Sequence, residues 1–96
     1  MSRDLVIRIV IRGRVQGVGF RYWTAGLARD LGLGGWVRNR RDGSVEAVFR
    51  GPAETVGRMI EACRGGPPSA RVETVEEHSV APDEAEEGNF EQRGTL

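Results

Sequence analysis

The sequence contains no lysine, so arginine supplies every basic side chain among its 96 residues. We attribute this bias to the codon usage of a GC-rich genome rather than to function. The absence nevertheless excludes chemistry that requires a lysine. Examples are the phosphate-binding lysine of a Walker A loop and a Schiff base with a carbonyl substrate.

Cysteine and histidine each occur once, as Cys63 and His78. A single cysteine cannot form an internal disulfide bond. Cys63 falls on the apolar face of an expected helix, where we expect a small buried side chain. The residues after it, 64–69, have the pattern of a helix end rather than of a phosphatase loop. His78 has no histidine or cysteine nearby in sequence, so we expect a strand surface residue rather than a metal ligand or general base.

The sequence also lacks long apolar runs, an excess of either charge and the layout of a secretory signal peptide. No segment is long enough to span a bilayer. The 14 basic and 14 acidic residues cancel, which argues against nucleic acid or an anionic membrane as a partner. We therefore expect one cytoplasmic domain over residues 1–96, with a modest hydrophobic core.

The N-terminal third of the sequence predicts a strand followed by a helix. Apolar residues alternate with others over residues 4–12, which indicates a strand whose odd positions face the core. Trp23, Leu27 and Leu31 recur at intervals of four, which indicates a helix over about residues 21–32. The glycines that follow are expected to end this helix.

A hairpin and a second helix are predicted next. Residues 36–39 and 44–50 have the pattern of two strands, joined by a turn that contains the Asp42-Gly43 pair. Pro52 is a favoured residue at the first position of a helix. The apolar stripe of this second helix consists of Val56, Met59, Ile60 and Cys63.

The C-terminal third has a weaker pattern. Valines among charged residues over about 70–80 indicate a strand at the edge of a sheet. Residues 82–88 are mostly acidic, and we expect them to form a solvated connection rather than a metal site. Phe90 and Gln92 favour a short additional strand, whereas residues 94–96 are expected to fray.

This order of elements predicts an α+β fold, the ferredoxin-like two-layer sandwich. An antiparallel sheet (βαββαβ, with the short extra strand) would carry both helices on one face. In this arrangement the loop after the first strand and the end of the second strand lie at the same end of the sheet. We therefore expect Asn39 to approach Arg21.

The segment from Gly13 to Arg21, with the sequence GRVQGVGFR, is the most informative part of the chain. Its three glycines allow the backbone to turn tightly and to bring its N–H groups close to a ligand. Arg21 stands where this loop becomes a helix. Backbone donors, a helix N-terminus and a guanidinium together favour the binding of phosphate or another oxyanion.

This segment resembles the first signature of the acylphosphatase family. Residues 35–39, with the sequence GWVRN, resemble the second signature, which continues through Asp42-Gly43 and Val45-Glu46. A glycine loop alone is weak support for a family. Two motifs at the expected separation and in the expected order of elements, covering about residues 5–80, are strong support.

The resemblance implies hydrolysis of the carboxyl-phosphate bond of small acyl phosphates without a metal or cofactor. It places the catalytic arginine at Arg21 and the catalytic asparagine at Asn39. Arginine can hold two phosphate oxygens, and a carboxamide can orient a water molecule. The backbone N–H groups that we expect to bind the phosphate belong to Gln16, Gly17, Val18, Gly19 and Phe20. Inorganic phosphate or sulfate is expected to fit the same site. We also expect the protein to be a monomer.

Each of these residues also has a simpler structural explanation. The glycines make a turn, Arg21 is an ordinary helix residue, and Asn39 is a turn former. Phe20 and Trp36 are expected to pack in or beside the core. Thr24 is expected to pack or to bond to its own helix backbone rather than to bind substrate. Only the joint occurrence of the motifs favours a functional role for Arg21 and Asn39.

Two other functions remain open on the sequence alone. RNA-recognition domains share this order of elements, but they display aromatic residues on the central strands, where this chain has only Phe49. The other alternative is an acylphosphatase-like module that senses carbamoyl phosphate or another anion without turnover. Hydrolysis of a model acyl phosphate distinguishes the enzyme from both.

Overall fold

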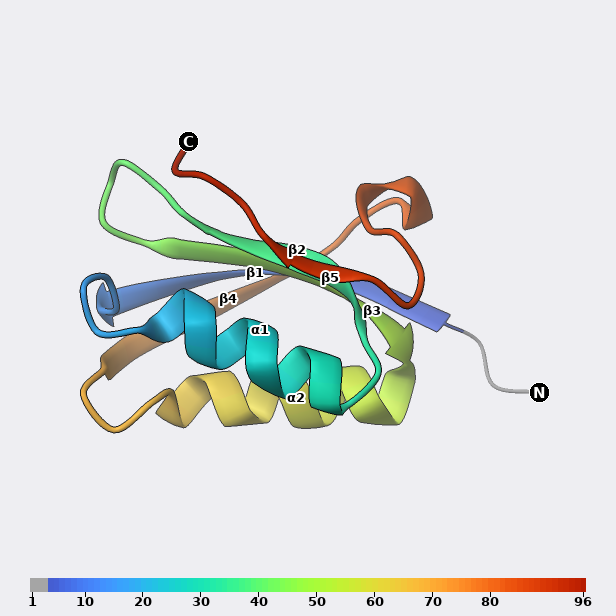
Figure 1. The fold of residues 1–96 in the computed structure, drawn as a ribbon, viewed down its shortest axis with the longest axis horizontal. Helices are drawn as coiled ribbons and strands as arrows, with labels where there is room; N and C mark the ends of the chain where they lie inside the picture. Colours follow the sequence, from blue (N-terminus) through green and yellow to red (C-terminus); the bar gives the residue numbers. More distant parts are fainter. Residues whose placement is uncertain (1–3) are drawn as a thin grey trace.

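Five strands form one sheet, and two helices cover one of its faces (Figure 1). The structure is a computed structural model that describes residues 4–96. Its elements in chain order are β1 (Asp4–Arg14), α1 (Phe20–Asp30), β2 (Gly34–Asn39), β3 (Val45–Pro52), α2 (Ala53–Gly65), β4 (Arg71–Ser79), a 3-10 helix (Pro82–Glu84) and β5 (Phe90–Gln92). The predicted α+β sandwich with both helices on one face is confirmed.

The sheet has the strand order β4-β1-β3-β2-β5 and mixed directions. β1 pairs antiparallel with β3 and β4, and β2 pairs antiparallel with β3. β5 pairs parallel with β2, with Phe90 opposite Gly35. The expectation of a wholly antiparallel sheet is therefore wrong at this edge. The chain crosses from the β4 edge to the β2 edge before β5 begins, so β5 enters beside the start of β2 and runs in the same direction.

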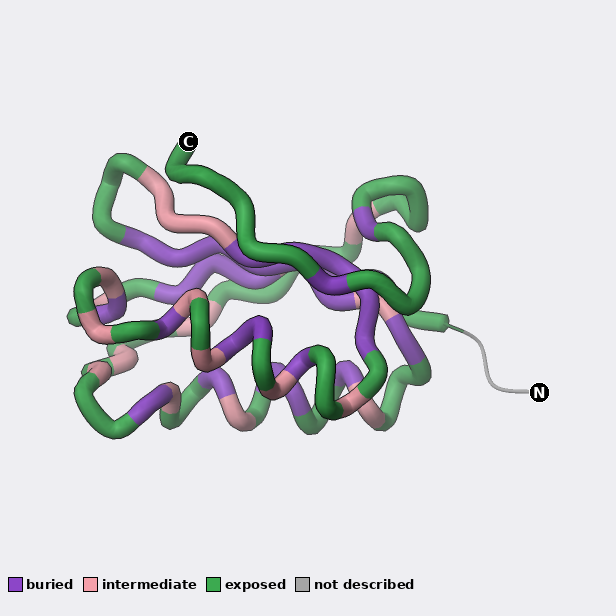
Figure 2. Tube along the Cα trace, in the orientation of Figure 1, coloured by how far each residue is buried: buried purple, intermediate pink, exposed green. Residues whose placement is uncertain are grey.

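The main core lies between the sheet and the helices (Figure 2). Ile7, Ile9 and Ile11 of β1 face it as predicted, and Ile9 and Ile11 are completely buried, whereas Leu5 near the start of the strand is exposed. Phe49 of β3 stacks on Phe90 of β5, with ring centroids 5.6 Å apart. Cys63 of α2 is buried in the same core, and burial raises the pKa of its thiol to about 12. The thiol is thus a packing group, as predicted.

A second, smaller apolar cluster lies on the opposite face of the sheet. It consists of Val6, Trp36, Val48 and Ala85, with Val80 packed against it. The indole N–H of Trp36 donates to the carbonyl of Glu84 at 2.9 Å. Segment 82–88 is therefore not simply a solvated connection, because its backbone and Ala85 cover part of this face.

The C-terminal residues extend the pairing along β2. The N–H of Arg93 donates to the carbonyl of Val37 at 2.8 Å, and that of Leu96 donates to the carbonyl of Asn39 at 3.2 Å. The N–H of Arg41 in turn donates to the carbonyl of Leu96 at 3.1 Å. The expectation that residues 94–96 fray is wrong. This segment instead supports the backbone of Asn39.

The remaining predictions for β4 are confirmed. β4 lies at the edge of the sheet, and most of its residues are exposed. His78 is an exposed strand residue whose Nε2 lies 3.8 Å from a carboxylate oxygen of Glu76. Within residues 4–96, no helix is long and apolar enough to cross a membrane.

Truncating the Phe90 ring tests the contribution of β5 to the core. Phe90→Ala is expected to lower the free energy of unfolding by about 3–5 kcal/mol, because it leaves a cavity against Phe49. Urea denaturation measures the change. Glu91→Ala, on the exposed neighbouring position, is the matched control and is expected to stay within about 0.5 kcal/mol. A Phe90→Ala loss no larger than the control's would show that β5 adds little to the core.

Candidate active site

The loop between β1 and α1 depends on two glycines in the left-handed region. Gly17 has φ 73° and Gly19 has φ 78°, a conformation that other residues adopt only with strain. A Cβ added at either position meets no atom within 4 Å. Backbone conformation, and not space, therefore requires glycine here. The loop that results turns directly into the first residue of α1.

The N-terminus of α1 is left open to an anion. Gly19 is its N-cap and offers no side-chain hydrogen bond, and the first turn contains no acidic residue. The first N–H groups of a helix have no partner within the helix, and they form the positive end of its dipole. Arg21, the second residue of α1, is half-buried and adds a full positive charge at this end. Such a helix end favours a phosphate-like group.

Asn39 reaches the same end of the sheet from β2. It is the last residue of the strand and pairs with Val45 of β3. The hairpin beyond it is closed by the N–H of Arg40, which donates to the carbonyl of Ser44 at 2.9 Å. The carboxylate of Asp42 accepts bonds from the backbone N–H of Ser44 at 2.9 Å and from its hydroxyl at 2.6 Å. The turn is therefore rigidly defined.

Gln16 joins the loop to this hairpin. Its side-chain nitrogen donates to the carbonyl of Arg40 at 2.7 Å and to the carbonyl of Ser44 at 2.8 Å. One carboxamide thus connects the loop that precedes Arg21 with the turn that follows Asn39. Figure 1 shows the β1–α1 loop and the β2–β3 hairpin at the same end of the molecule.

A hollow of about 150 Å³ lies at this junction, and we name it the Arg21 hollow. Its lining residues are Val15, Gly17, Gly19, Phe20, Arg21, Tyr22, Asn39 and Gln92. The structure thus brings Arg21 and Asn39 to one hollow, as the order of elements predicts. Of the predicted loop residues, Gln16 and Val18 do not line it. The Gln16 side chain bonds to the hairpin, and Val18 packs on the core.

The sequence analysis did not identify Tyr22 and Gln92 as site residues. Gln92 pairs with Val37 in the parallel β2–β5 ladder, which places it beside the end of β2. Only the parallel direction of β5 brings it there, and the pattern of a three-residue strand does not reveal that direction. Tyr22 immediately follows Arg21 in α1. This adjacency is the one feature of the sequence that could have identified Tyr22 as a site residue.

Thr24 and Phe20 pack in the interior. Both are buried, and Phe20 meets Trp23 edge to face, with centroids 5.5 Å apart. The hydroxyl of Thr24 has no hydrogen-bond partner within residues 4–96, and Thr24 does not line the Arg21 hollow. Packing, the structural alternative for these two side chains, therefore accounts for their positions.

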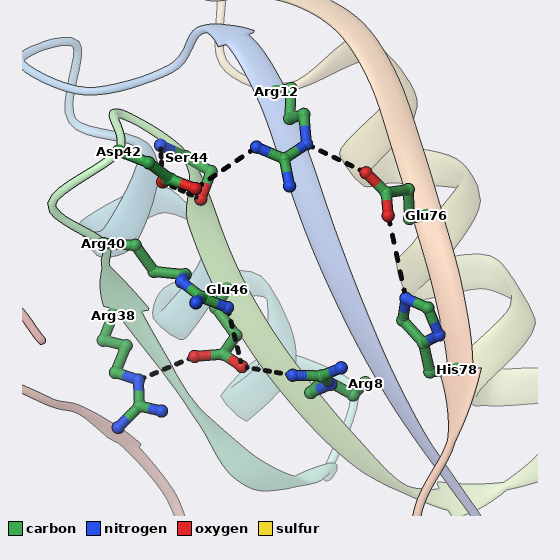
Figure 3. A network of polar contacts seen from close by, with 9 residues as sticks. All are labelled: Arg8, Arg12, Arg38, Arg40, Asp42, Ser44, Glu46, Glu76 and His78. Atoms are coloured by element: carbon green, nitrogen blue, oxygen red, sulfur yellow. Dashed lines mark hydrogen bonds and ion pairs between the residues drawn. The ribbon is translucent and has the colours of Figure 1, made fainter.

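A second group of arginines lies on the face of the sheet away from the helices, around Glu46 (Figure 3). The buried Glu46 carboxylate accepts from Arg8 at 2.9 Å and from Arg38 at 2.8 Å, and Arg40 lies 3.7 Å away. Burial disfavours the charged form of Glu46, but the bonds from Arg38 and Arg8 outweigh it and lower its pKa. These arginines are therefore already paired with a carboxylate.

The two regions differ in the charge that they offer to an anion. Within residues 4–96, Arg21 has no hydrogen bond or ion pair from its guanidinium to another residue. The hollow beside Glu46, of about 420 Å³, is lined by two arginines and two glutamates, whose formal charges cancel. The residues lining the Arg21 hollow include a cation and no carboxylate. An anion is therefore attracted more strongly to the smaller hollow.

Within residues 4–96, no group of three or more His, Cys, Asp or Glu residues is placed to hold a metal ion. The Arg21 hollow instead contains a guanidinium, a helix N-terminus and two carboxamides. This set can bind a tetrahedral oxyanion and place a water molecule beside it. A ferredoxin-like sandwich with such a site fits the class of proteins that bind small phosphate compounds.

Comparison with known proteins agrees with this class. The acylphosphatase family model matches residues 7–92. An acylphosphatase of Nitrobacter hamburgensis is 65% identical over 78 residues, which are 81% of this chain and 79% of that protein. An acylphosphatase of Rhodospirillum rubrum is 52% identical over 95 residues, which are 98% of this chain and 99% of that protein. An acylphosphatase structure from Coxiella burnetii has a TM-score of 0.85 and 33% identity, and the match covers 94% of this chain and 93% of that one.

The chain belongs to the acylphosphatase family, and the resemblance noted in the sequence is confirmed. Its activity is the hydrolysis of acyl phosphates. The enzyme is thus favoured over the RNA-binding and anion-sensing alternatives.

Gln16→Ala tests the connection between loop and hairpin. It removes two hydrogen bonds, and the free energy of unfolding is expected to fall by about 1–2 kcal/mol. The kcat/KM for acetyl phosphate is expected to fall about tenfold or more, because small displacements of positioning groups are costly. Chemical denaturation and steady-state kinetics measure the two effects. An unchanged kcat/KM together with a lower free energy of unfolding would show that Gln16 stabilises the fold but does not position the site.

Asp42 supports the hairpin through its ionised form. The Ser44 hydroxyl, then the Ser44 backbone N–H and to a lesser degree Arg12, lower the pKa of Asp42 from 3.8 to about 2. Its stabilising effect is therefore complete above the unfolded-state pKa and is lost as pH falls through the folded-state value. Carbon-13 NMR of the Asp42 carboxyl is expected to show a midpoint near 2.

Ser44→Ala is the matched control for this titration. It removes the hydroxyl donor and keeps the backbone N–H, so the Asp42 pKa is expected to rise only part of the way toward 3.8. A wild-type midpoint already at that ordinary value would refute the proposed role of Ser44.

Proposed function

We propose that Arg21 binds the phosphoryl group of the substrate and that Asn39 orients the attacking water. The observation that carries this proposal is the meeting of the two residues in one hollow at an uncapped helix N-terminus. The backbone N–H groups of residues 16–20 complete the phosphate site in this scheme, with Gly17, Gly19 and Phe20 at the lining of the hollow and Gln16 and Val18 in the same turn. They supply fixed donors for oxygens that the guanidinium does not reach.

Arg21 suits this role because its guanidinium stays charged at any working pH and can bind two oxygens at once. Within residues 4–96 it has no carboxylate partner that an incoming phosphate must displace. The charge that develops on the phosphoryl oxygens in the transition state is then stabilised by a cation that is already in position.

Asn39 cannot act as a general base, because a carboxamide does not titrate in the working pH range. It can accept one hydrogen bond and donate another, which allows it to orient a water molecule for in-line attack. Its own backbone is held by Val45 on one side and by the N–H of Leu96 on the other. This support from both sides favours a positioning role.

The reaction needs neither a strong base nor a metal in this scheme. The water oxygen forms a bond to phosphorus, while the bond from phosphorus to the acyl oxygen breaks and the carboxylate leaves with the electron pair. The proton of the water passes to a phosphate oxygen of the substrate. A loose transition state with a good leaving group depends mainly on positioning and charge stabilisation.

We further infer a monomeric cytoplasmic enzyme that acts on small acyl phosphates without a cofactor. Within residues 4–96 the large exposed apolar side chains are scattered at Leu5, Tyr22 and Leu96, which supports a monomer. The unpaired Cys63 suits a reducing compartment. The balanced charge argues against nucleic acid as a partner. Inorganic phosphate, the product, and sulfate, of similar shape, would occupy the Arg21 hollow.

Two variants separate the proposed roles. Arg21→Ala is expected to reduce turnover of acetyl phosphate by a factor on the order of 10²–10³ or more and to weaken inhibition by inorganic phosphate. Asn39→Ala is expected to reduce turnover while the inhibition constant for phosphate stays nearly unchanged. Steady-state hydrolysis with a chelator present measures both effects, and circular dichroism verifies folding.

Equal losses of phosphate inhibition in the two variants would contradict this division of roles. Wild-type activity that disappears with chelator and returns with added metal would contradict the metal-free scheme. Arg41→Ala, on the exposed hairpin and outside the lining of the hollow, is the matched control for removal of one positive charge.

A further inference from the structure

Gly26 is a glycine in the middle of α1 that the backbone does not require. It is not among the residues with positive φ, and a Cβ added to it meets no atom within 4 Å. An interior helical glycine is less favourable than alanine, because it loses more conformational freedom when the helix forms. The helix is thus less stable at this position without any gain in packing.

The missing side chain leaves open a groove on the outer surface of α1. This groove, of about 370 Å³, is lined by Tyr22, Trp23, Gly26, Leu27, Arg29 and Asp30. We name it the α1 groove. Contacts hold two of its lining side chains, because Trp23 packs against Phe20 and the Arg29 Nε donates to the carbonyl of Phe90 at 3.1 Å. These two side chains give the groove one fixed border, and Tyr22 is its exposed border.

Tyr22 joins the α1 groove to the Arg21 hollow. It lines both, and it is 79% exposed, although an aromatic ring gains most from burial. The hollows beside Glu46 and beside Asp42 share no lining residue with the Arg21 hollow. The α1 groove also includes Arg29 and Asp30, but Tyr22, Trp23 and Leu27 give it the apolar side chains that an acyl group can contact.

We propose that the α1 groove binds the acyl group of the substrate and that Tyr22 is a specificity-determining residue. This inference rests on the proposed function, which seats the phosphoryl group beside Arg21. The acyl group then extends past Tyr22, whose ring covers one face of it, toward the open surface at Gly26. The substrates that this arrangement favours are acyl phosphates with a flat or extended apolar acyl group, such as an aromatic ring.

The test compares benzoyl phosphate with acetyl phosphate, whose methyl group is too short to reach Gly26. Tyr22→Ala removes the aromatic wall, and Gly26→Leu fills the groove. In both variants the ratio of kcat/KM for benzoyl phosphate to that for acetyl phosphate is expected to fall about tenfold. Most of the fall is expected as a higher KM for benzoyl phosphate, because the acyl contacts persist from ground state to transition state.

Gly57→Leu is the matched control. Gly57 is an exposed glycine inside α2, a Cβ there also meets no atom within 4 Å, and it does not line the α1 groove. Its substrate ratio is expected to equal that of the wild type. Gly26→Ala is the milder variant should leucine disturb folding. It is expected to raise the melting temperature through helix propensity and to lower the ratio by a smaller factor.

A ratio that is unchanged or raised in Tyr22→Ala and in the folded Gly26 variant would overturn the acyl-group site. The proposed function would stand in that case, because both substrates would still be hydrolysed. A wild-type protein that hydrolyses neither substrate would instead overturn the proposed function itself. An equal fall of the benzoyl to acetyl phosphate ratio in Gly57→Leu would show that any leucine in a helix has this effect. That result would also refute the binding of the acyl group in the α1 groove.

Discussion

The carboxamide of Gln16 carries the contact on which the site depends. Its two hydrogen bonds, at 2.7 and 2.8 Å, attach the loop before α1 to the hairpin after β2. The loop follows β1 and the hairpin follows β2, and these two strands are not neighbours in the sheet, because β3 lies between them. Without this link, the loop that precedes Arg21 would have no side-chain hydrogen bond from Gln16 to the hairpin that follows Asn39. With it, Arg21 and Asn39 line one hollow.

The site also depends on which arginines remain available. Around Glu46, three guanidinium groups share one buried carboxylate, so each of them already has a carboxylate partner within the protein. At the start of α1, the nearest features are glycines and a helix end without acidic residues. Among the described residues 4–96, Arg21 therefore has no carboxylate partner at the place where the backbone donors gather. An electrostatic site of this kind suits a reaction in which a good leaving group departs and charge grows on phosphoryl oxygens.

Much of the fold is predictable because local patterns and global topology agree. Alternation in β1 and the apolar stripes of the helices specify the main core, and the element order places Asn39 near Arg21. The other face of the sheet is harder to predict. Val6 is apolar at an even position of β1 and packs on this face, but Ala85, which covers part of it, lies in an acidic segment with no periodic pattern.

The missed parts of the site depend on contacts between distant residues. Gln16 bonds to residues 24 and 28 positions away, and no local rule of spacing reveals such a pair. Gln92 reaches the hollow only because β5 runs parallel to β2. Three residues of strand do not specify that direction. The sequence motifs therefore identify the reacting groups, whereas the residues that align and border them require the folded structure.

Nitrogen-15 NMR during a titration with inorganic phosphate tests the central claim most directly. The account predicts chemical-shift changes centred on the backbone amides of residues 16–21, and it predicts that Arg21→Ala abolishes them at the same phosphate concentration. Changes centred on Arg8, Arg38 and Arg40, or the same loop response in Arg21→Ala as in the wild type, would contradict it.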